Sequence, residues 1–198
     1  MIYSVIDVET TGLSANAGDR ILEIGIARLE EDGRIVDVLD TLVNPEGPVR
    51  ATHVHGISAH MVEGAPTFTA LIPKIQSVLD GTVIAAHNAS FDMGFLKAEY
   101  RRSGVSFKLP PAVCTLVLAR KLLPHLKSKS LESCRRMLGL SDEGAHNALA
   151  DARSAAHLLQ YLKTNHPGEA GGQAFFLPEE NQAPGLFDME DMLTLKSR

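Results

Sequence analysis

The sequence is poor in cysteine, has no long apolar run and does not begin with a basic leader. Its two cysteines, Cys114 and Cys134, have no paired spacing, which argues against a disulfide framework or a zinc knuckle. No run of about 18 apolar residues is present, and the opening MIYSVIDVE meets an acid at position 7, so neither membrane spanning nor export is indicated. We therefore expect a cytoplasmic protein without a membrane partner.

Positive charge is scarce in the first half of the chain. Residues 1–96 hold 5 Lys and Arg against 13 Asp and Glu, whereas residues 97–136 hold 10 against 2. The formal net charge of −5 therefore hides an acidic part that could hold cations beside a basic part that could hold phosphates. A charged helical surface with no partner is the alternative, because solvated charge runs are common.

Hydrophobic periodicity predicts strands separated by helices. Apolar runs predict strands at 2–8, 21–29, 34–43, 82–88 and 112–116, and helical spacing predicts helices at 65–81, 90–104, 130–138 and 147–163. This order indicates an α/β domain over residues 1–164, with a central mixed five-stranded sheet flanked by helices. Residues 165–198 are rich in Gly, Pro, Gln and acids, so we expect a flexible tail that could bind a partner.

Two acids stand near the end of the first predicted strand. Successive side chains of a strand alternate between its faces, so Asp7 and Glu9 project from the same face. The residues before them are largely apolar on both faces, which predicts a central strand where unpaired charges are costly. Solvation at the strand end, a salt bridge to an arginine or a bound cation could each compensate the two carboxylates.

Two further acids lie on the apolar stripes of predicted helices. Asp92 precedes apolar side chains by three and four residues, and Asp151 shares its stripe with alanine and leucine. Asp92 could instead complement the positive end of its helix. Four inward carboxylates repel one another unless a cation joins them, and all-oxygen ligation favours Mg²⁺ or Mn²⁺ over zinc. We therefore predict a divalent metal site, where two ions can promote displacement at a phosphodiester.

Histidines offer a general base and a zinc alternative. His146 precedes Asp151 by five residues, and histidine suits general-base work because it titrates near neutrality. An exposed loop histidine is the alternative interpretation. His53, His55 and His60 have no cysteine partners, so a turn leading into a short helix is favoured over a zinc site.

Three motifs, in this order, resemble those of a known family. DVETTGL at 7–13, HNASFD at 87–92 and HNALAD at 146–151 are similar to the three exonuclease motifs of the DEDDh superfamily, which includes the proofreading epsilon subunit of bacterial replicative DNA polymerase. The similarity spans residues 1–164. It implies a ribonuclease H-like fold and a 3′-to-5′ exonuclease that releases nucleoside 5′-monophosphates.

The resemblance also implies roles for individual residues. Two divalent cations, Mg²⁺ or Mn²⁺, would be held by Asp7, Glu9, Asp92 and Asp151, with His146 as general base. The residues implied to bind the substrate are Thr10, Thr11, Leu13, His55 and Ile57, with Asn88 and Phe91 in supporting positions. Position 147 is Asn, where the sister DEDDy group has tyrosine.

Two short peptides of the tail resemble partner-binding segments. GGQAFFL holds Gln173 just after the domain, and QAPGLF, with Gln182, Leu186 and Phe187, is similar to a sliding-clamp peptide. A linker with incidental apolar residues is the alternative, because such short matches arise easily by chance. We expect single-stranded DNA ends as substrate, and either a polymerase partner or a stand-alone role in repair. An RNA-trimming nuclease and a non-catalytic clamp or polymerase adaptor are the alternatives.

Overall fold

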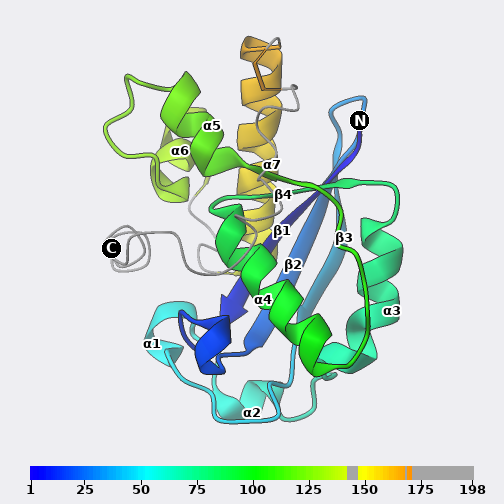
Figure 1. Cartoon of the computed structure of the whole chain (residues 1–198). Helices are drawn as coiled ribbons and strands as arrows, with labels where there is room; N and C mark the ends of the chain where they lie inside the picture. The colour runs from blue at the N-terminus through cyan, green and yellow to red at the C-terminus, as the bar shows by residue number, and fades with distance from the viewer. Residues whose placement is uncertain (142–146, 168, 171–198) are drawn as a thin grey trace.

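The computed structural model describes residues 1–141, 147–167 and 169–170, and its centre is one mixed sheet. The strands are β1 (Tyr3–Thr10), β2 (Ile21–Leu29), β3 (Ile35–Leu42), β4 (Val83–Ala86) and β5 (Ala112–Cys114), in the order β3-β2-β1-β4-β5. β1 pairs antiparallel with β2 and parallel with β4, so the strand that carries the two acids is central (Figure 1). The predicted mixed five-stranded sheet is confirmed.

Helices cover both faces of this sheet. They are the 3₁₀ helix η1 (Ala15–Ala17) and the α-helices α1 (Thr52–His55), α2 (Ala59–Val62), α3 (Phe68–Leu79), α4 (Ala89–Arg102), α5 (Thr115–Leu122), α6 (Leu131–Leu138) and α7 (Ala148–Asn165). The four predicted helices correspond to α3, α4, α6 and α7. Helix α3 tolerates Pro73 and is capped by Thr67, whose hydroxyl accepts a hydrogen bond from the amide of Ala70 at 3.3 Å.

The alternation of β1 side chains divides the apolar core into two clusters. Ile6 and Val8 belong to the cluster that includes residues of α3 and α4, whereas Tyr3 and Val5 belong to the cluster that includes residues of α5 and α7. Helices α4 and α7 accordingly lie on opposite faces of the sheet (Figure 1). Asp7 and Glu9 follow Tyr3 and Val5 at intervals of two, so they lie on the face that α7 covers.

The second cluster continues beyond α7. Ala170 is buried in it, and Lys121 of α5 forms an ion pair of 3.3 Å with Glu169. Packing against the domain therefore reaches residue 170, past the boundary expected at 164. Within the described part of the chain, no helix is both long and apolar enough to cross a bilayer.

A buried ion pair ties α4 to the start of β2. The Nε and Nη2 atoms of Arg20 donate to the two carboxylate oxygens of Glu99 at 2.7 and 3.0 Å, and Glu99 is 2% exposed. Arg102 also donates to Glu99, and it reaches the carbonyl of Ala15 at 2.7 Å. The two-pronged geometry favours this pair, and it fixes the loop that follows the acids of β1.

His87 of the second motif is a structural residue. Its Nδ1 lies 3.0 Å from Thr115 Oγ1 and its Nε2 lies 2.9 Å from the carbonyl oxygen of Lys129, so the ring joins β4 to α5 and to the loop before α6. Burial lowers the pKa of His87 to about 4, with a smaller lowering by the charge of Arg120.

The neutral state of His87 should make stability depend on pH. The folded pKa lies below the ordinary value, so the contribution is full above about 6.5 and is lost as pH falls towards about 4, by about 3 kcal/mol in all. Urea unfolding at pH 7, 5.5 and 4.5 should therefore show a steeper loss of the free energy of unfolding for the wild type than for His87→Gln. Equal pH dependence in the two proteins would contradict this prediction.

Candidate active site

The register of β1 and β2 fixes the two acids of the first motif. Asp7 pairs with Gly25 of β2 and Glu9 pairs with Glu23. Asp7 is half-buried, and Glu9 is 4% exposed. Both acids lie on the face that α7 covers, so an acid at the start of that helix can reach them.

Helix α7 brings Asp151 to the strand acids. Asn147 begins the helix, since its Oδ1 accepts from the amide of Ala150 at 3.1 Å, and Asp151 follows in the first turn. Asp7, Glu9 and Asp151 each offer a carboxylate oxygen, and these atoms all lie within 4.8 Å of one another. The structure thus brings together three of the four acids that the sequence singles out.

The chemistry of these donors fits a hard divalent cation. Three carboxylates this close together repel one another, and the partly buried setting strengthens the repulsion. Oxygen ligands suit Mg²⁺ or Mn²⁺, and the described residues of the group include no sulfur or imidazole ligand that would favour zinc. A divalent metal site at this position is compatible with the fold.

Asp92 is not one of the three acids of this group. It is 3% exposed in the first turn of α4, whose apolar residues pack on the other face of the sheet. Its burial agrees with the predicted inward direction. Among the described residues, its carboxylate is not one of the three that meet within 4.8 Å, and its role as a fourth ligand stays a prediction.

Arg135 holds Asp151 by a hydrogen bond. From the sequence alone, this arginine counts only as one of the basic residues of the segment 97–136. Arg135 of α6 is 4% exposed; its Nη1 donates to Asp151 Oδ1 at 2.9 Å and its Nη2 to the carbonyl oxygen of Ser141 at 2.8 Å. A salt bridge to an arginine, which the sequence suggests for the β1 acids, is formed by Asp151. A signal was present, because Arg135 follows Leu131 by four residues and so lies on the apolar stripe of its helix.

Glu23 is a further acid beside the group. It is 7% exposed, and its Oε1 and Oε2 accept hydrogen bonds from Asn147 Nδ2 at 2.6 Å and from the amide of Ala148 at 3.1 Å. Burial raises the pKa of Glu23, and the charges of Asp40, Glu9 and Asp151 raise it further, against the lowering by the amide. The sequence offers no local signal for this contact, since Glu23 and Asn147 are far apart in the chain.

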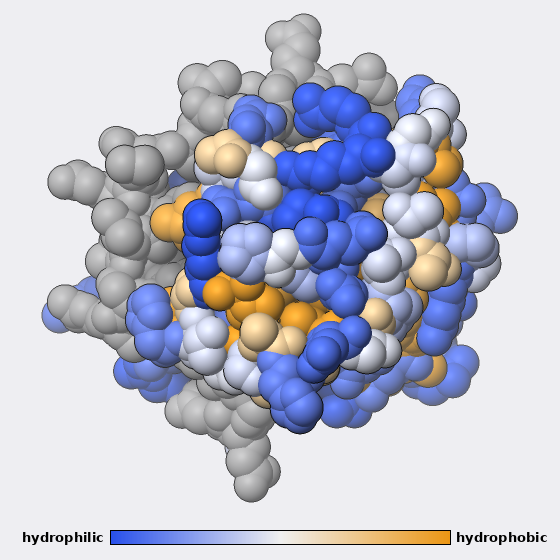
Figure 2. All heavy atoms as spheres, turned by 90° about the horizontal axis from the view of Figure 1, so that it is seen from below, coloured by the Kyte–Doolittle hydropathy of each residue, from blue (hydrophilic) through white to orange (hydrophobic). Residues whose placement is uncertain are grey.

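The loop after β1 is built by its threonines. Thr10 Oγ1 donates to the carbonyl of Gly12 at 2.6 Å, and Thr11 Oγ1 accepts from the amide of Arg20 at 3.0 Å. Both threonines are buried, whereas Leu13 is 41% exposed. On the face seen from below, which includes this end of the molecule, apolar surface is bordered by hydrophilic residues (Figure 2). Of the three predicted contacts in this loop, Leu13 presents the most surface.

The other predicted substrate residues are mostly internal. His55 Nδ1 accepts from the amide of Ile57 at 3.0 Å and Nε2 lies 3.1 Å from the carbonyl oxygen of Arg50, so the ring shapes the turn between α1 and α2. Ile57 is 3% exposed. Asn88 has a left-handed φ of 76° before α4, and the partly buried ring of Phe91 packs 4.9 Å from that of Phe95.

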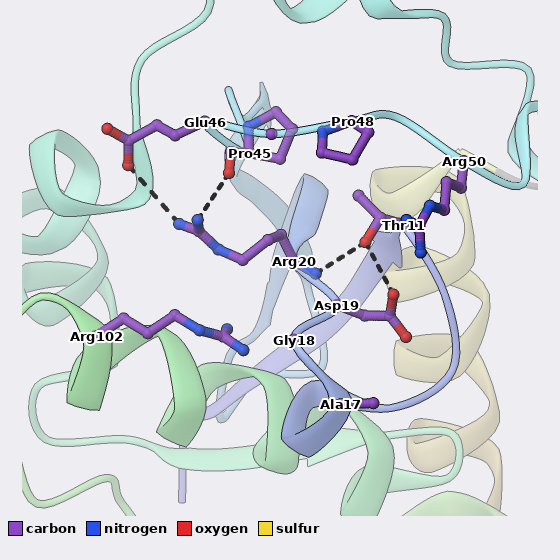
Figure 3. Close-up of a pocket in the computed structure, with 11 residues that line it drawn as sticks. Thr11, Ala17, Gly18, Asp19, Arg20, Pro45, Glu46, Pro48, Arg50 and Arg102 are labelled. Atoms are coloured by element: carbon purple, nitrogen blue, oxygen red, sulfur yellow. Dashed lines mark hydrogen bonds and ion pairs between the residues drawn. The ribbon is translucent and has the colours of Figure 1, made fainter.

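A polar pocket of about 330 Å³ lies beside the loop that joins β1 to β2. Figure 3 shows Thr11 and Asp19 on one side and Arg20 with Glu46 on another. Arg50 and Arg102 also line it, so three guanidinium groups and two carboxylates surround the space.

Several predicted residues fall outside the described part of the chain: His146, Gln173, Gln182, Leu186 and Phe187.

A family model described as an exonuclease, RNase_T, matches residues 4–159. The chain belongs to this exonuclease family. Among its RNase_T relatives is the DNA polymerase III PolC-type of Clostridium perfringens, 40% identical over 161 residues, which are 80% of this chain and 11% of that protein. The PolC-type protein of Caldanaerobacter subterraneus is 35% identical over 159 residues, 79% of this chain and again 11% of the relative. The chain thus spans about a tenth of these relatives.

Solved structures of exonucleases share the fold. Exonuclease X in complex with 5′ overhanging duplex DNA has a TM-score of 0.67 and 27% identity, covering 85% of this chain and 95% of that one. The nuclease domain of 3′hExo, a DEDDh family member bound to rAMP, has a TM-score of 0.72 and 17% identity, covering 83% and 92%. The predicted ribonuclease H-like fold and the resemblance to DEDDh exonucleases are confirmed.

Proposed function

We propose that this RNase_T protein is a metal-dependent 3′-5′ exonuclease that releases nucleoside 5′-monophosphates from DNA 3′ ends, as a proofreading or repair nuclease. The observation that carries the proposal is the meeting of Asp7, Glu9 and Asp151 within 4.8 Å in a chain of an exonuclease family. Similarity to a DNA polymerase III PolC-type supports a polymerase context, and similarity to exonuclease X supports DNA as substrate.

In this proposal the four acids bind the metal ions, and Arg135 orients one of these acids. Asp7, Glu9 and Asp151 would hold one divalent cation, and Asp92 would contribute to a second. When bound, Mg²⁺ or Mn²⁺ supplies Lewis-acid stabilisation at the phosphodiester and activates the attacking water. Arg135 holds the Asp151 carboxylate in one orientation, and it offsets part of the negative charge of the group.

The nucleic acid would approach across the end of β1. Leu13 is the exposed apolar side chain of that loop, and we assign it contact with the terminal base, while Thr10 and Thr11 hold the loop in shape. Arg101 in the last turn of α4, Lys108 after α4 and Arg120 in the last turn of α5 are exposed, and the proposal assigns them contact with phosphates. The basic run is therefore only partly a binding surface, because Arg135 is turned inward.

The test uses 5′-labelled single-stranded DNA, 5′-overhanging duplex, 3′-mismatched duplex and RNA, with Mn²⁺, Mg²⁺ or EDTA. We expect a ladder that shortens from the 3′ end of DNA in metal and no cleavage in EDTA. Faster trimming of RNA than of every DNA substrate would overturn DNA as the substrate. A folded, Mn²⁺-binding protein that degrades none of them would overturn the enzyme and favour a nuclease-like adaptor.

Replacing the proposed general base should separate chemistry from metal binding. We expect His146→Ala to lower kcat by about 10²- to 10⁴-fold, with Mn²⁺ affinity within twofold of wild type, because the carboxylates remain. Single-turnover cleavage and calorimetric Mn²⁺ titration measure the two quantities. A variant with wild-type kcat would remove His146 from the mechanism.

We propose that the tail after residue 170 binds a sliding clamp or polymerase through Gln173 or the Gln182, Leu186 and Phe187 peptide. A chain ending at Ala170 keeps the packed core, so it should cleave short oligonucleotides at the wild-type rate while losing affinity for a bacterial sliding clamp. Cleavage assays and surface plasmon resonance check both parts. A collapse of oligonucleotide cleavage would show that the tail belongs to the catalytic domain.

A cytoplasmic location belongs to the same proposal. Cys114 and Cys134 are both buried and free, as expected in a reducing compartment. Burial raises the pKa of the Cys134 thiol to about 11, so this thiol is protonated at neutral pH.

A further inference from the structure

Glu23 reaches from the sheet to the beginning of α7. The first amides of a helix have no partner within the helix, and one of them, the amide of Ala148, is bound by Glu23 Oε2 at 3.1 Å. Glu23 Oε1 accepts from Asn147 Nδ2 at 2.6 Å. One side chain of β2 thus holds two consecutive residues at the start of the helix that carries Asp151.

The strand register places this contact opposite the metal acids. Glu23 pairs across the strands with Glu9, and Gly25, two residues on, pairs with Asp7. At Gly25 the backbone of α7 lies against the strand, since a Cβ there would stand 2.2 Å from the amide nitrogen of Leu149. Glu23 and Gly25, which both contact the start of α7, are therefore the cross-strand neighbours of the two acids of β1.

The chemistry of the contact requires a carboxylate. Two donors converge on Glu23, an amide N–H and a side-chain NH₂. A glutamine has one acceptor oxygen and an NH₂ group, so it would satisfy one donor and set a donor against the other. Glu23 is a fourth acid beside Asp7, Glu9 and Asp151 and adds repulsion to the site, but its two carboxylate oxygens accept both hydrogen bonds.

We propose that Glu23 is a positioning residue, which fixes the first turn of α7 against β2 and so holds the carboxylate of Asp151 beside Asp7 and Glu9. The inference rests on the proposed function for its catalytic meaning, but its first consequence is metal affinity. Asp151 is the fourth residue of the helix, so a rotation or shift of the first turn moves its carboxylate directly.

The experiment measures Mn²⁺ binding by calorimetry on the full chain, together with Tm. We expect Glu23→Gln to weaken Mn²⁺ affinity about 10-fold and Glu23→Ala up to about 100-fold, as for residues that orient metal ligands. Asp37→Asn is the matched control, because Asp37 of β3 also tethers α7, through a more exposed ion pair with Arg153 at 2.9 Å. Its Mn²⁺ affinity should stay within twofold of wild type.

Asn147→Ser distinguishes positioning from simple charge. Serine keeps an oxygen that can cap the helix at Ala150, but its side chain is one atom shorter than the arm that carries the amide NH₂ to Glu23, while the charge of Glu23 remains. Positioning predicts weaker Mn²⁺ binding for this variant, and an effect of charge alone predicts none. Should Glu23→Ala not fold, Glu23→Gln and Asn147→Ser still decide the matter.

Besides an effect of charge alone, two results would overturn the inference. Glu23→Gln and Asn147→Ser with a lowered Tm but wild-type Mn²⁺ affinity would leave Glu23 a merely structural residue. Wild-type affinity together with wild-type Tm would remove the role altogether. The proposed function fails separately, if the wild-type chain binds Mn²⁺ and cleaves no nucleic acid while the Glu23 variants still bind Mn²⁺ more weakly.

Discussion

Asp7→Asn should lower the rate of 3′-end cleavage by a factor of about 10³ or more. Asp7 supplies one of three carboxylate oxygens that lie within 4.8 Å of one another. Metal-ion stabilisation of a phosphodiester displacement is worth several kcal/mol, and about 1.4 kcal/mol corresponds to tenfold in rate. The amide of asparagine keeps the shape of the side chain but removes the charge that attracts the cation, so most of that stabilisation is lost.

The folded state should not suffer from the same change. In EDTA the three carboxylates repel one another, and Asp7→Asn removes part of that repulsion. We therefore expect a Tm equal to or above that of the wild type without metal, and a smaller rise in Tm on adding Mn²⁺. Asp32→Asn, at the exposed hairpin between β2 and β3, is the control and should cleave normally. Wild-type cleavage by Asp7→Asn would remove Asp7 from the site.

Local patterns were sufficient to predict the direction of the acids. Strand alternation places Asp7 and Glu9 on one face, and helical periodicity turns Asp151 inward. Their meeting depends on which elements lie side by side, and here those elements are distant in the chain: β1 lies near its start, whereas Asp151 belongs to α7 (Ala148–Asn165). The family motifs supplied that information indirectly, because their order implied a shared fold.

The unpredicted parts of the site have different physical reasons. Arg135 and Arg136 are neighbours in one basic run, yet their side chains are 5% and 62% exposed, and the net charge of a segment does not distinguish them. The position of each arginine relative to the apolar stripe of α6 does distinguish them, as the same criterion predicts the inward direction of Asp92 and Asp151. Glu23 carries no such signal, because its donors at Asn147 and Ala148 come from a helix that folds back onto β2.

Gly25→Ala should destabilise the fold and weaken the metal site together. A Cβ at Gly25 would lie 2.2 Å from the amide nitrogen of Leu149 and 2.3 Å from the carbonyl carbon of Ala148. These are backbone atoms of α7 and no side chain can turn aside, so the first turn of the helix has to move away from β2. Such overpacking costs about 3 kcal/mol, which lowers Tm by about 6–12 °C in a domain of this size.

The displacement of α7 in Gly25→Ala should affect the metal site as well as the stability of the fold. Since Asp7 is the cross-strand partner of Gly25, pushing α7 off the strand increases the distance between Asp151 and the β1 acids. We expect weaker Mn²⁺ binding and slower cleavage even at temperatures where the variant is fully folded. Gly64→Ala is the control, because Gly64 has open space around its missing Cβ and no left-handed φ. A Gly25→Ala protein with wild-type Tm and Mn²⁺ affinity would show that α7 does not depend on this close approach to hold Asp151 in place.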